Sequence, residues 1–311
     1  MRLLASSVGS TLAAELAAIL AGNASRRPTD AFLAGDHANL WSILASGGWL
    51  AAGLPETAGG AGADLRDLLE LAVAWGGYLA PLPFLETVLT YRWLGGAPTP
   101  GDAHTAPITF AVPVSEGLLV PHAARPGIRL FAGQRVVPAA IPPLESIDEF
   151  APSLPLGIVR NATPLAEEQV AELAALAAGQ AVGAARKCLA DAIAHACERV
   201  AFGKAIATFQ SVRHLLADMH TNVEIAMSAA VWAAQPGAVG RDRAARFCLA
   251  QSRGVITDAI QTFGGMGFTW ELGIHFYLRH VLALERLTGT SPKALSARGS
   301  TSRPNQRRYR G

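Results

Sequence analysis

Cysteine is scarce in this sequence, which holds only three among 311 residues. Cys188, Cys197 and Cys248 show no paired spacing and fall inside stretches with helical periodicity. This pattern argues against a disulfide framework and favours small buried thiols in the reducing cytoplasm. None of the eight histidines forms a ligand-spaced cluster with carboxylates, so we expect no metal site.

An excess of charge of one sign is also missing. Twenty-six basic and 24 acidic residues leave a net charge of +2, which does not indicate nucleic-acid binding. No apolar run approaches the ~18 residues that a membrane-spanning helix needs. The first 24 residues faintly resemble a secretion signal, but Glu15 interrupts the apolar stretch, and Leu12 and Leu16 recur at helical spacing. We therefore predict an amphipathic first helix instead of a signal peptide or a membrane anchor.

Helical periodicity dominates the two ends of the chain, and a region rich in proline and glycine separates them. We expect residues 1–96 to form an N-terminal helical domain, in which Asp64 caps one helix. In residues 97–160 the segments "APTPGD", "RPG" and "IPP" punctuate short apolar runs. That alternation predicts a small β domain with a few short strands and no large sheet.

Helical spacing returns in residues 161–290, with Thr163 expected as a cap and Pro164 at the first helical position. Four long helices with short connections predict an antiparallel four-helix bundle. The expected fold class is thus mainly α with a small β region. Residues 291–311 carry no hydrophobic pattern and end with five arginines in the last 14 residues. We expect this basic tail to be disordered, with a docking arm as the alternative.

Two breaks between the predicted C-terminal helices carry unusual residues. The first is "ERVAFGKAIATFQSVRHLLADM" (198–219), and the second is "QTFGGMGFTWE" (261–271), with three glycines in four positions. Glycines at this spacing suggest that the backbone here comes into close contact with another group. Together with the upstream "GWLAAGLPETAGGAGADLRDLLEL" and the helix–strand–helix order, these segments resemble the acyl-CoA dehydrogenase family. The resemblance covers most of residues 40–290.

The resemblance implies FAD as the cofactor. In this family the Gln-x-x-Gly-Gly segment of one subunit reaches the ADP part of the neighbouring subunit's FAD. Glycine N–H groups can close on phosphate oxygens, and an arginine supplies a permanently charged donor fork for the pyrophosphate. The residues that match family positions at this cofactor are Arg199, Phe202, Phe209, Gln210, Gln261, Gly264, Gly265 and Thr290.

The family's catalytic base has no counterpart in this sequence. In the family a glutamate removes the α-proton of the acyl-CoA, and the β-hydrogen leaves as hydride to the flavin. The two family positions for this glutamate correspond to Thr288 and Leu173, and neither is a carboxylate. We therefore expect no catalytic residue in this chain. Glu172 and Glu285 lie nearby in the sequence, where we expect solvated carboxylates on helix surfaces.

The β region is also shorter than in full-length members. It lacks the family's Thr-Glu-Pro-x-Ala-Gly-Ser loop and Gly-x-Lys-x-x-Ile-Thr strand, which hold the flavin ring and cover the substrate. We therefore expect a truncated β domain. The chain looks like the short subunits of actinobacterial α2β2 enzymes that dehydrogenate CoA thioesters of steroid side chains.

The resemblance implies a full-length partner subunit that holds most of the acyl-CoA, with electron-transfer flavoprotein as the electron acceptor. Two alternatives remain open. One is a self-sufficient homo-oligomeric dehydrogenase that uses Glu172 or Glu285 as its base. The other is a structural scaffold without flavin.

Overall fold

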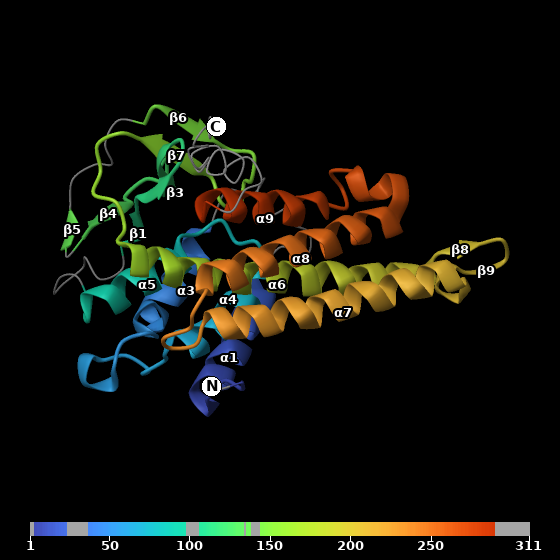
Figure 1. Ribbon diagram of the computed structural model, residues 1–311, viewed down its shortest axis with the longest axis horizontal. Helices are drawn as coiled ribbons and strands as arrows, with labels where there is room; N and C mark the ends of the chain where they lie inside the picture. The colour runs from blue at the N-terminus through green and yellow to red at the C-terminus, as the bar shows by residue number, and fades with distance from the viewer. Residues whose placement is uncertain (1–2, 24–36, 98–105, 134, 138–143, 290–311) are drawn as a thin grey trace, which may run out of the picture.

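The computed structural model describes residues 3–23, 37–97, 106–133, 135–137 and 144–289. It shows a mainly helical chain with small sheets at one side (Figure 1). The predicted fold class, mainly α with a small β region and a C-terminal helical domain, is therefore confirmed. Thr290 and the tail that follows it lie outside the described residues. Across the described ranges, no helix is long and apolar enough to cross a membrane.

The N-terminal part is built from helices that pack around α4. Asp64 caps α4 as predicted, because its carboxylate accepts a hydrogen bond from the Asp67 N–H at 3.0 Å. Helix α1 buries Leu16 and Leu20 in the core. The helices and 3-10 turns of this part are α1 (Ser7–Asn23), α3 (Ala38–Ser46), η1 (Trp49–Ala51), η2 (Glu56–Ala58), α4 (Leu65–Gly76) and α5 (Phe84–Leu94).

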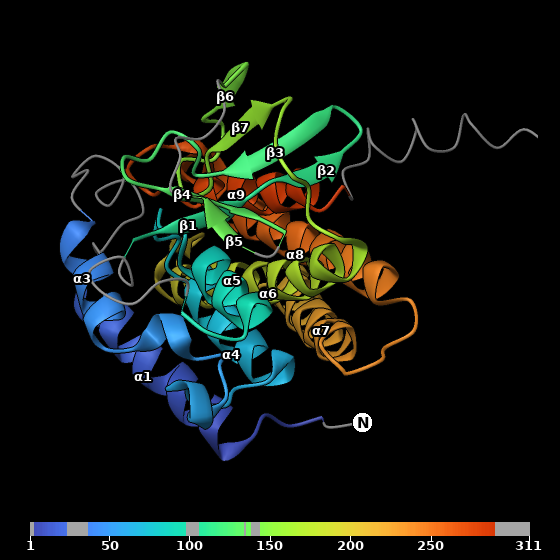
Figure 2. The same ribbon diagram turned by 90° about the vertical axis from the view of Figure 1, so that its left-hand side faces the viewer.

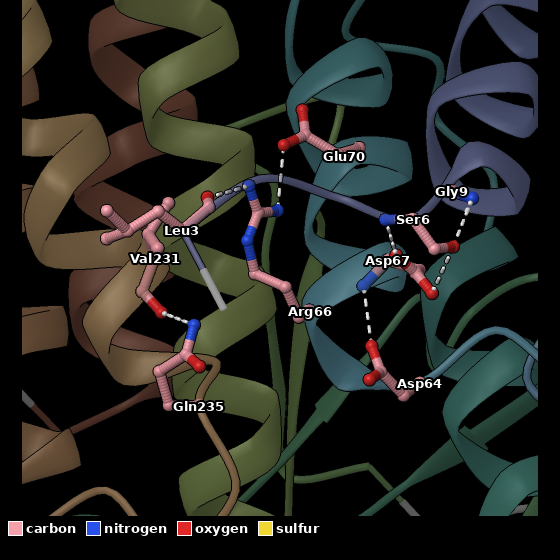
Figure 3. Close-up of polar contacts among 9 residues, drawn as sticks. All are labelled: Leu3, Ser6, Gly9, Asp64, Arg66, Asp67, Glu70, Val231 and Gln235. Carbon is pink, nitrogen blue, oxygen red and sulfur yellow. Dashed lines mark hydrogen bonds and ion pairs between the residues drawn. The ribbon is translucent and has the colours of Figure 1, made fainter. Parts of the chain in front are cut away.

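Polar contacts fasten the segment before α1 to the first turns of α4 (Figure 3). The Asp67 carboxylate accepts hydrogen bonds from the Ser6 N–H at 2.8 Å and from the Ser6 hydroxyl at 2.9 Å. Arg66 is 3% exposed and donates to the Leu3 carbonyl at 2.9 Å and to Glu70 at 2.7 Å. Two buried charged residues thus hold the N-terminal segment in place.

The β region consists of short strands in two sheets. In the first sheet, of order β1-β4-β5, β1 runs parallel to β4; in the second, of order β2-β3-β7-β6, all pairs are antiparallel. The strands are β1 (Ile108–Phe110), β2 (Val112–Val114), β3 (Gly117–Pro121), β4 (Arg129–Ala132), β5 (Arg135–Val137), β6 (Ser146–Asp148) and β7 (Leu156–Val159). None is longer than five residues, as the punctuated sequence predicts.

The C-terminal part contains the four predicted helices, with α6 at its centre. Figure 2 shows the N-terminal helices on one side of these helices and the strands on the other, above α9. The elements are α6 (Glu167–Glu198), β8 (Val200–Ala201), β9 (Lys204–Ala205), η4 (Ile206–Thr208), α7 (Gln210–Ala233), α8 (Arg241–Phe263), η5 (Gly264–Phe268) and α9 (His275–Leu287).

The predicted start of α6 is wrong by several residues. The helix begins at Glu167, not directly after Thr163. Pro164 instead forms a β-bridge with Ala111, and the Leu165 N–H donates to the Ala111 carbonyl at 2.9 Å. This pairing with the β region keeps the chain extended through the proline, so tertiary contacts override the local helix-start signal.

Helices α4 and α6 approach each other with their backbones almost in contact. A Cβ added at Gly76 would overlap the Gln180 carbonyl oxygen, and a Cβ added at Gly183 would overlap that of Val73. Only glycine fits at these two points. This close contact between α4 and α6 joins the N-terminal helices to the C-terminal helices.

A buried polar network joins the β region, α9 and α6. His280 Nδ1 lies 2.9 Å from the Ser153 hydroxyl, and His280 Nε2 lies 3.2 Å from Gln180 Oε1. Because an amide oxygen only accepts, we assign Nε2 as the donor and Nδ1 of the neutral ring as the acceptor. His280 is 2% exposed, and burial lowers its pKa to about 4. The neutral imidazole satisfies both hydrogen bonds, and protonation is unfavourable because it would bury a positive charge.

The pH dependence of the free energy of unfolding should reveal the protonation of His280. Because the folded pKa lies below the unfolded value of 6.5, its stabilising contribution is complete above pH 6.5 and declines as the pH falls towards 4. Between pH 6.5 and 4.5 the free energy of unfolding should fall by about 2 kcal/mol from His280 alone. The measurement is urea unfolding across this range for the wild type and His280→Gln. The variant should show a shallower decline, and equal declines in both proteins would contradict the assignment.

Candidate functional site

A two-residue hairpin follows α6 and presents an aromatic side chain to the surface. Ala201 pairs with Lys204, and the two residues between them have positive φ, 51° at Phe202 and 78° at Gly203. These angles are typical of a type I′ turn. A bulky residue rarely adopts such a φ, yet Phe202 does so with 95% of its surface exposed. Its ring lies 6.2 Å, edge to face, from Phe209 at the start of α7. A strained, exposed aromatic is suited to contact a ligand or another subunit.

Arg199 lies between α6 and this hairpin. Its N–H donates to the His195 carbonyl at 2.8 Å, and its own carbonyl accepts from the Ile206 N–H at 2.8 Å. The backbone is therefore fixed while the side chain is exposed. No carboxylate in the described part of the chain pairs with the guanidinium. Burial and then Arg199 lower the pKa of the neighbouring His195, and Glu198 opposes this shift. An exposed guanidinium that forms no ion pair can bind an anion.

The glycines after α8 divide into two kinds. Gly264 has φ 62° and ψ −137°, which only glycine adopts readily, and a Cβ added there or at Gly265 would meet nothing within 4 Å. At Gly267 an added Cβ would lie 2.5 Å from the Ile260 carbonyl oxygen. The first two glycines thus leave an open backbone surface, whereas the third permits packing. Gln261, in the last turn of α8, is exposed beside them.

These features gather at one end of the bundle. The rings of His195 and Phe263 lie 4.5 Å apart, so the last turns of α6 and α8 are in contact. Figure 1 shows the β8–β9 hairpin, the start of α7 and the end of α8 at this same end. All predicted cofactor residues in the described chain, including Gln210 at the first position of α7, therefore lie here.

The same end carries contact residues that the motifs did not single out. Lys204 Nζ lies 4.5 Å from the centre of the Phe209 ring. Phe268 is 73% exposed and Trp270 is 48% exposed, directly after the glycines. The sequence signal for these aromatic residues was the "FTW" that follows the glycine segment, because exposed aromatic residues are enriched where proteins contact their partners.

A pocket of about 460 Å³ lies at the opposite end of the bundle. Its walls come from the first turns of α6 and α8, from Pro113 of β2, and from Thr288 and Gly289 after α9. The Thr288 hydroxyl donates to the Leu284 carbonyl at 2.8 Å. One of the two family base positions thus lines this pocket with a hydroxyl group, which is not basic at neutral pH.

Glu172 does not face this pocket. Val170, Ala171 and Ala174 line it, and at about 100° per residue Glu172 projects from the other side of α6. There its carboxylate accepts a hydrogen bond from Trp93 Nε1 at 2.8 Å and pairs with an arginine of α5 at 3.5 Å.

Glu285 is held in a similar way. It is 3% exposed and pairs with Arg253 Nε at 3.0 Å. Burial raises its pKa, and Arg253 opposes that shift. The expectation of solvated surface carboxylates at Glu172 and Glu285 was therefore wrong, because each glutamate faces a neighbouring helix.

The carboxylates that do line the pocket are Glu167 and Asp242. Asp242 forms an ion pair with Arg246 one turn along α8. Glu167, in the first turn of α6, is exposed. Sequence reasoning passed over both because neither occupies a family base position.

Metal and disulfide chemistry find no support in the described ranges. No group of three His, Cys, Asp or Glu residues there could hold a metal ion. The three cysteines are free thiols. Cys188 and Cys248 are buried as expected, but Cys197 is exposed.

Comparison with known proteins adds to this geometry. Residues 163–295 match the family model described as "Acyl-CoA dehydrogenase, C-terminal domain". Acyl-CoA dehydrogenase IpdE2 of Mycobacterium tuberculosis is 31% identical over 279 residues, covering 86% of this chain and 87% of that protein. Acyl-CoA dehydrogenase FadE34 of the same species is 29% identical over 300 residues, covering 83% of this chain but only 42% of the relative.

Solved structures share the fold along nearly the whole chain. The ChsE4–ChsE5 complex from Mycobacterium tuberculosis contains a chain that superposes with a TM-score of 0.72, at 17% identity, covering 98% of this chain and 100% of that one. A variant of the Tcur3481–Tcur3483 steroid ACAD superposes with a TM-score of 0.71, at 22% identity, covering 94% of this chain and 99% of that one. Given the near full-length match to IpdE2, the chain belongs to the acyl-CoA dehydrogenase family.

Proposed function

We propose that this chain is the non-catalytic subunit of a heteromeric acyl-CoA dehydrogenase and completes the FAD site of a partner subunit. The observation that carries the proposal is the exposed end of the bundle, where Arg199, Phe202 and the open glycine pair Gly264-Gly265 lie together. These groups have the chemistry of a dinucleotide site. The absence of a carboxylate at Leu173 and Thr288 adds the inference that the chain is non-catalytic.

The residues present fit the ADP half of FAD. Arg199 would donate to the pyrophosphate, and the N–H groups of Gly264 and Gly265 would approach phosphate oxygens without a Cβ in the way. Gln261 offers an amide to ribose or phosphate oxygens. Phe202, Phe209 and Gln210, at the same end of the bundle, would line the cofactor beside them. When bound, FAD supplies the acceptor for the hydride that leaves the acyl β-carbon.

The length of α6 supports an arrangement between subunits. From Leu173 to Glu198 this helix rises by roughly 40 Å, at about 1.5 Å per residue. The end that bears the cofactor residues and the pocket beside Thr288 are therefore far apart within one chain. We infer that the exposed end serves the active site of a neighbouring subunit, and that this neighbour supplies the base and the flavin-ring site.

The partner would be a full-length acyl-CoA dehydrogenase-like chain in an α2β2 assembly. The names ChsE4–ChsE5 and Tcur3481–Tcur3483 each join two proteins, which supports a heteromer. The partner would hold most of the acyl-CoA, and electron-transfer flavoprotein would accept the electrons. We propose a bulky, steroid-type acyl group, because one of these similar structures is named a steroid ACAD. We also propose the division into domains 1–96, 97–160 and 161–290, followed by the tail 291–311.

One observation keeps the self-sufficient enzyme as a second candidate. Glu167 lines the pocket beside Thr288 and is exposed, so a carboxylate is present there even though it lies outside the family positions. A chain that formed homo-oligomers and used Glu167 as its base would need no partner. The flavin-free scaffold has no comparable support.

The stoichiometry of flavin tests the proposal directly. Co-expression with a full-length family member should give a yellow complex with one FAD per pair of unlike chains. The measurement is flavin absorbance per mole of each chain after size-exclusion chromatography. Two FADs per pair, or a yellow and active homo-oligomer of this chain alone, would contradict the proposal.

Within such a complex, Arg199→Ala should weaken FAD binding by about 10–100-fold, the usual effect of losing one charge-assisted hydrogen bond. The affinity is measured by flavin fluorescence during titration of the apo-complex. Arg243→Ala is the matched control, because Arg243 is also exposed but lies at the first turn of α8, the opposite end of the bundle. An unchanged affinity in Arg199→Ala would place the pyrophosphate elsewhere.

A further inference from the structure

A second pocket, of about 310 Å³, lies between the N-terminal helices and the β region. It is formed by the residue before α3, the loop between α4 and α5, the loop between β3 and β4, and the segment before β7. Four prolines form much of its wall, and they restrict backbone motion there. The lining residues are His37, Pro81, His122, Arg125, Pro126, Pro152 and Pro155. The polar side chains among them are all basic, and no carboxylate is included.

His122 is held in an unusual conformation at this pocket. Its φ is 53°, in the left-handed region that few non-glycine residues adopt. Its N–H donates to the Pro155 carbonyl at 2.7 Å, and its carbonyl accepts from the Arg125 N–H at 2.9 Å. The residue is 3% exposed, yet nothing in the described chain hydrogen-bonds to its ring. Such strain is often found where a side chain is positioned for a ligand.

Arg125 supplies the charge of the pocket. One Nη atom donates to the Pro81 carbonyl at 3.3 Å, which fixes the side chain across the cavity. Within the described residues no carboxylate pairs with this partly buried guanidinium. Burial lowers its pKa, as expected for a cation with incomplete solvation. A partly buried guanidinium without a carboxylate partner is stabilised strongly by an anion that enters the pocket.

From the geometry of His122 and Arg125 we propose that this pocket binds a small oxyanion, a carboxylate or phosphate group on a small molecule. Arg125 would carry the charge-assisted contact, and the His122 ring would donate a hydrogen bond from the floor. The volume is at the lower end of that for small-molecule sites, which suits one anionic group with a short organic body. The site is separate from the exposed end that bears Arg199, so it does not depend on the proposed function.

The protonation state of His122 is consistent with this assignment. Burial, followed by Arg125 and His280, lowers the pKa of His122 to about 3. The ring is therefore neutral at pH 7 and offers one N–H donor. The pocket then depends on Arg125 for its fixed positive charge, which matches a singly charged group.

The test is thermal unfolding of the full-length chain at pH 7 with sodium phosphate or sodium succinate, at an ionic strength held constant with sodium chloride. At least one of the two anions should raise the midpoint in a saturable manner, because it binds only the folded state. The anion with the lower saturation concentration identifies the group as phosphate or carboxylate. No rise beyond that of chloride for either anion would overturn the proposal.

Variants separate a site from a general effect of charge. Arg125→Gln should weaken the apparent affinity by at least ~10-fold, whereas Arg160→Gln, at an 81% exposed arginine of the β region, should leave it unchanged. Equal affinity in Arg125→Gln and wild type would overturn the proposal. Should Arg125→Gln fail to fold, histidine-ring NMR of the wild type decides instead. The His122 resonances, assigned by comparison with His122→Asn, should shift on addition of the anion and reach saturation. Unchanged His122 resonances would overturn the proposal.

Discussion

Replacing Gly183 with alanine should lower the free energy of unfolding by at least ~4 kcal/mol, a large part of the ~5–15 kcal/mol of a typical domain. The added Cβ would overlap the Val73 carbonyl oxygen and lie 2.9 Å from the carbonyl carbon. Both obstructing atoms belong to the backbone of α4, so no side-chain rotation relieves the clash. Helix α4 would have to move away from α6 and open the close packing of the core between them.

Gly254→Ala provides the matched control for this experiment. Gly254 lies within α8, is exposed, and a Cβ added there meets nothing within 4 Å. Alanine at that position should stabilise the protein by about 0.5–1 kcal/mol through helix propensity. The measurement is the free energy of unfolding in urea for both variants and for the wild type. A Gly183→Ala protein as stable as wild type would show that α4 and α6 do not pack at this distance.

The close contact between α4 and α6 could not be predicted from the sequence, although the helices themselves could. The periodicity of residues 161–290 correctly predicts four helices, and Asp64 is correctly identified as a cap. In "GQAVGAARK" the four-residue spacing of Gly179 and Gly183 permits a close helix contact, but it does not identify the element that approaches. The role of Gly183 depends on Val73, more than 100 residues away, and a one-dimensional pattern does not name that partner. The displaced start of α6 has the same origin, since Pro164 pairs with Ala111.

The candidate cofactor residues were accessible from the sequence for a different reason. The three glycines after α8 are conspicuous at a break between helices, whereas Arg199 and Phe202 were identified through the resemblance to a family motif. The environments of Glu172 and Glu285 were not accessible. Each glutamate lies in a regular helix, and only the fold reveals that one faces Trp93 and the other Arg253.

These environments bear on which chain performs proton abstraction. A general base must reach the α-carbon of the substrate with an available carboxylate. One carboxylate oxygen of Glu172 accepts from Trp93 and one of Glu285 accepts from Arg253. Neither side chain lines the pocket beside Thr288. Glu167 lines that pocket but lies outside the family positions.

We therefore expect Glu167→Gln, Glu172→Gln and Glu285→Gln to retain turnover within a few-fold of wild type in the purified heteromer. Glutamine keeps the shape and hydrogen bonding of glutamate while removing its basicity. Because Glu285→Gln leaves Arg253 without its ionic partner, kcat is expressed per bound FAD, so that loss of assembly is not mistaken for loss of chemistry.

The partner subunit should behave in the opposite way. Changing its family-position glutamate to glutamine should lower kcat by several orders of magnitude while FAD stays bound, because a catalytic base contributes about 10²–10⁴-fold or more in rate. The comparison uses one bulky acyl-CoA, one assembled complex and the same electron acceptor throughout. If Glu167→Gln alone abolished turnover in a complex that kept its flavin, the base would lie in this chain, in the pocket beside Thr288. The non-catalytic assignment would then be wrong, although the role of Arg199 and the glycine pair at the opposite end of the bundle would still stand on its own measurement.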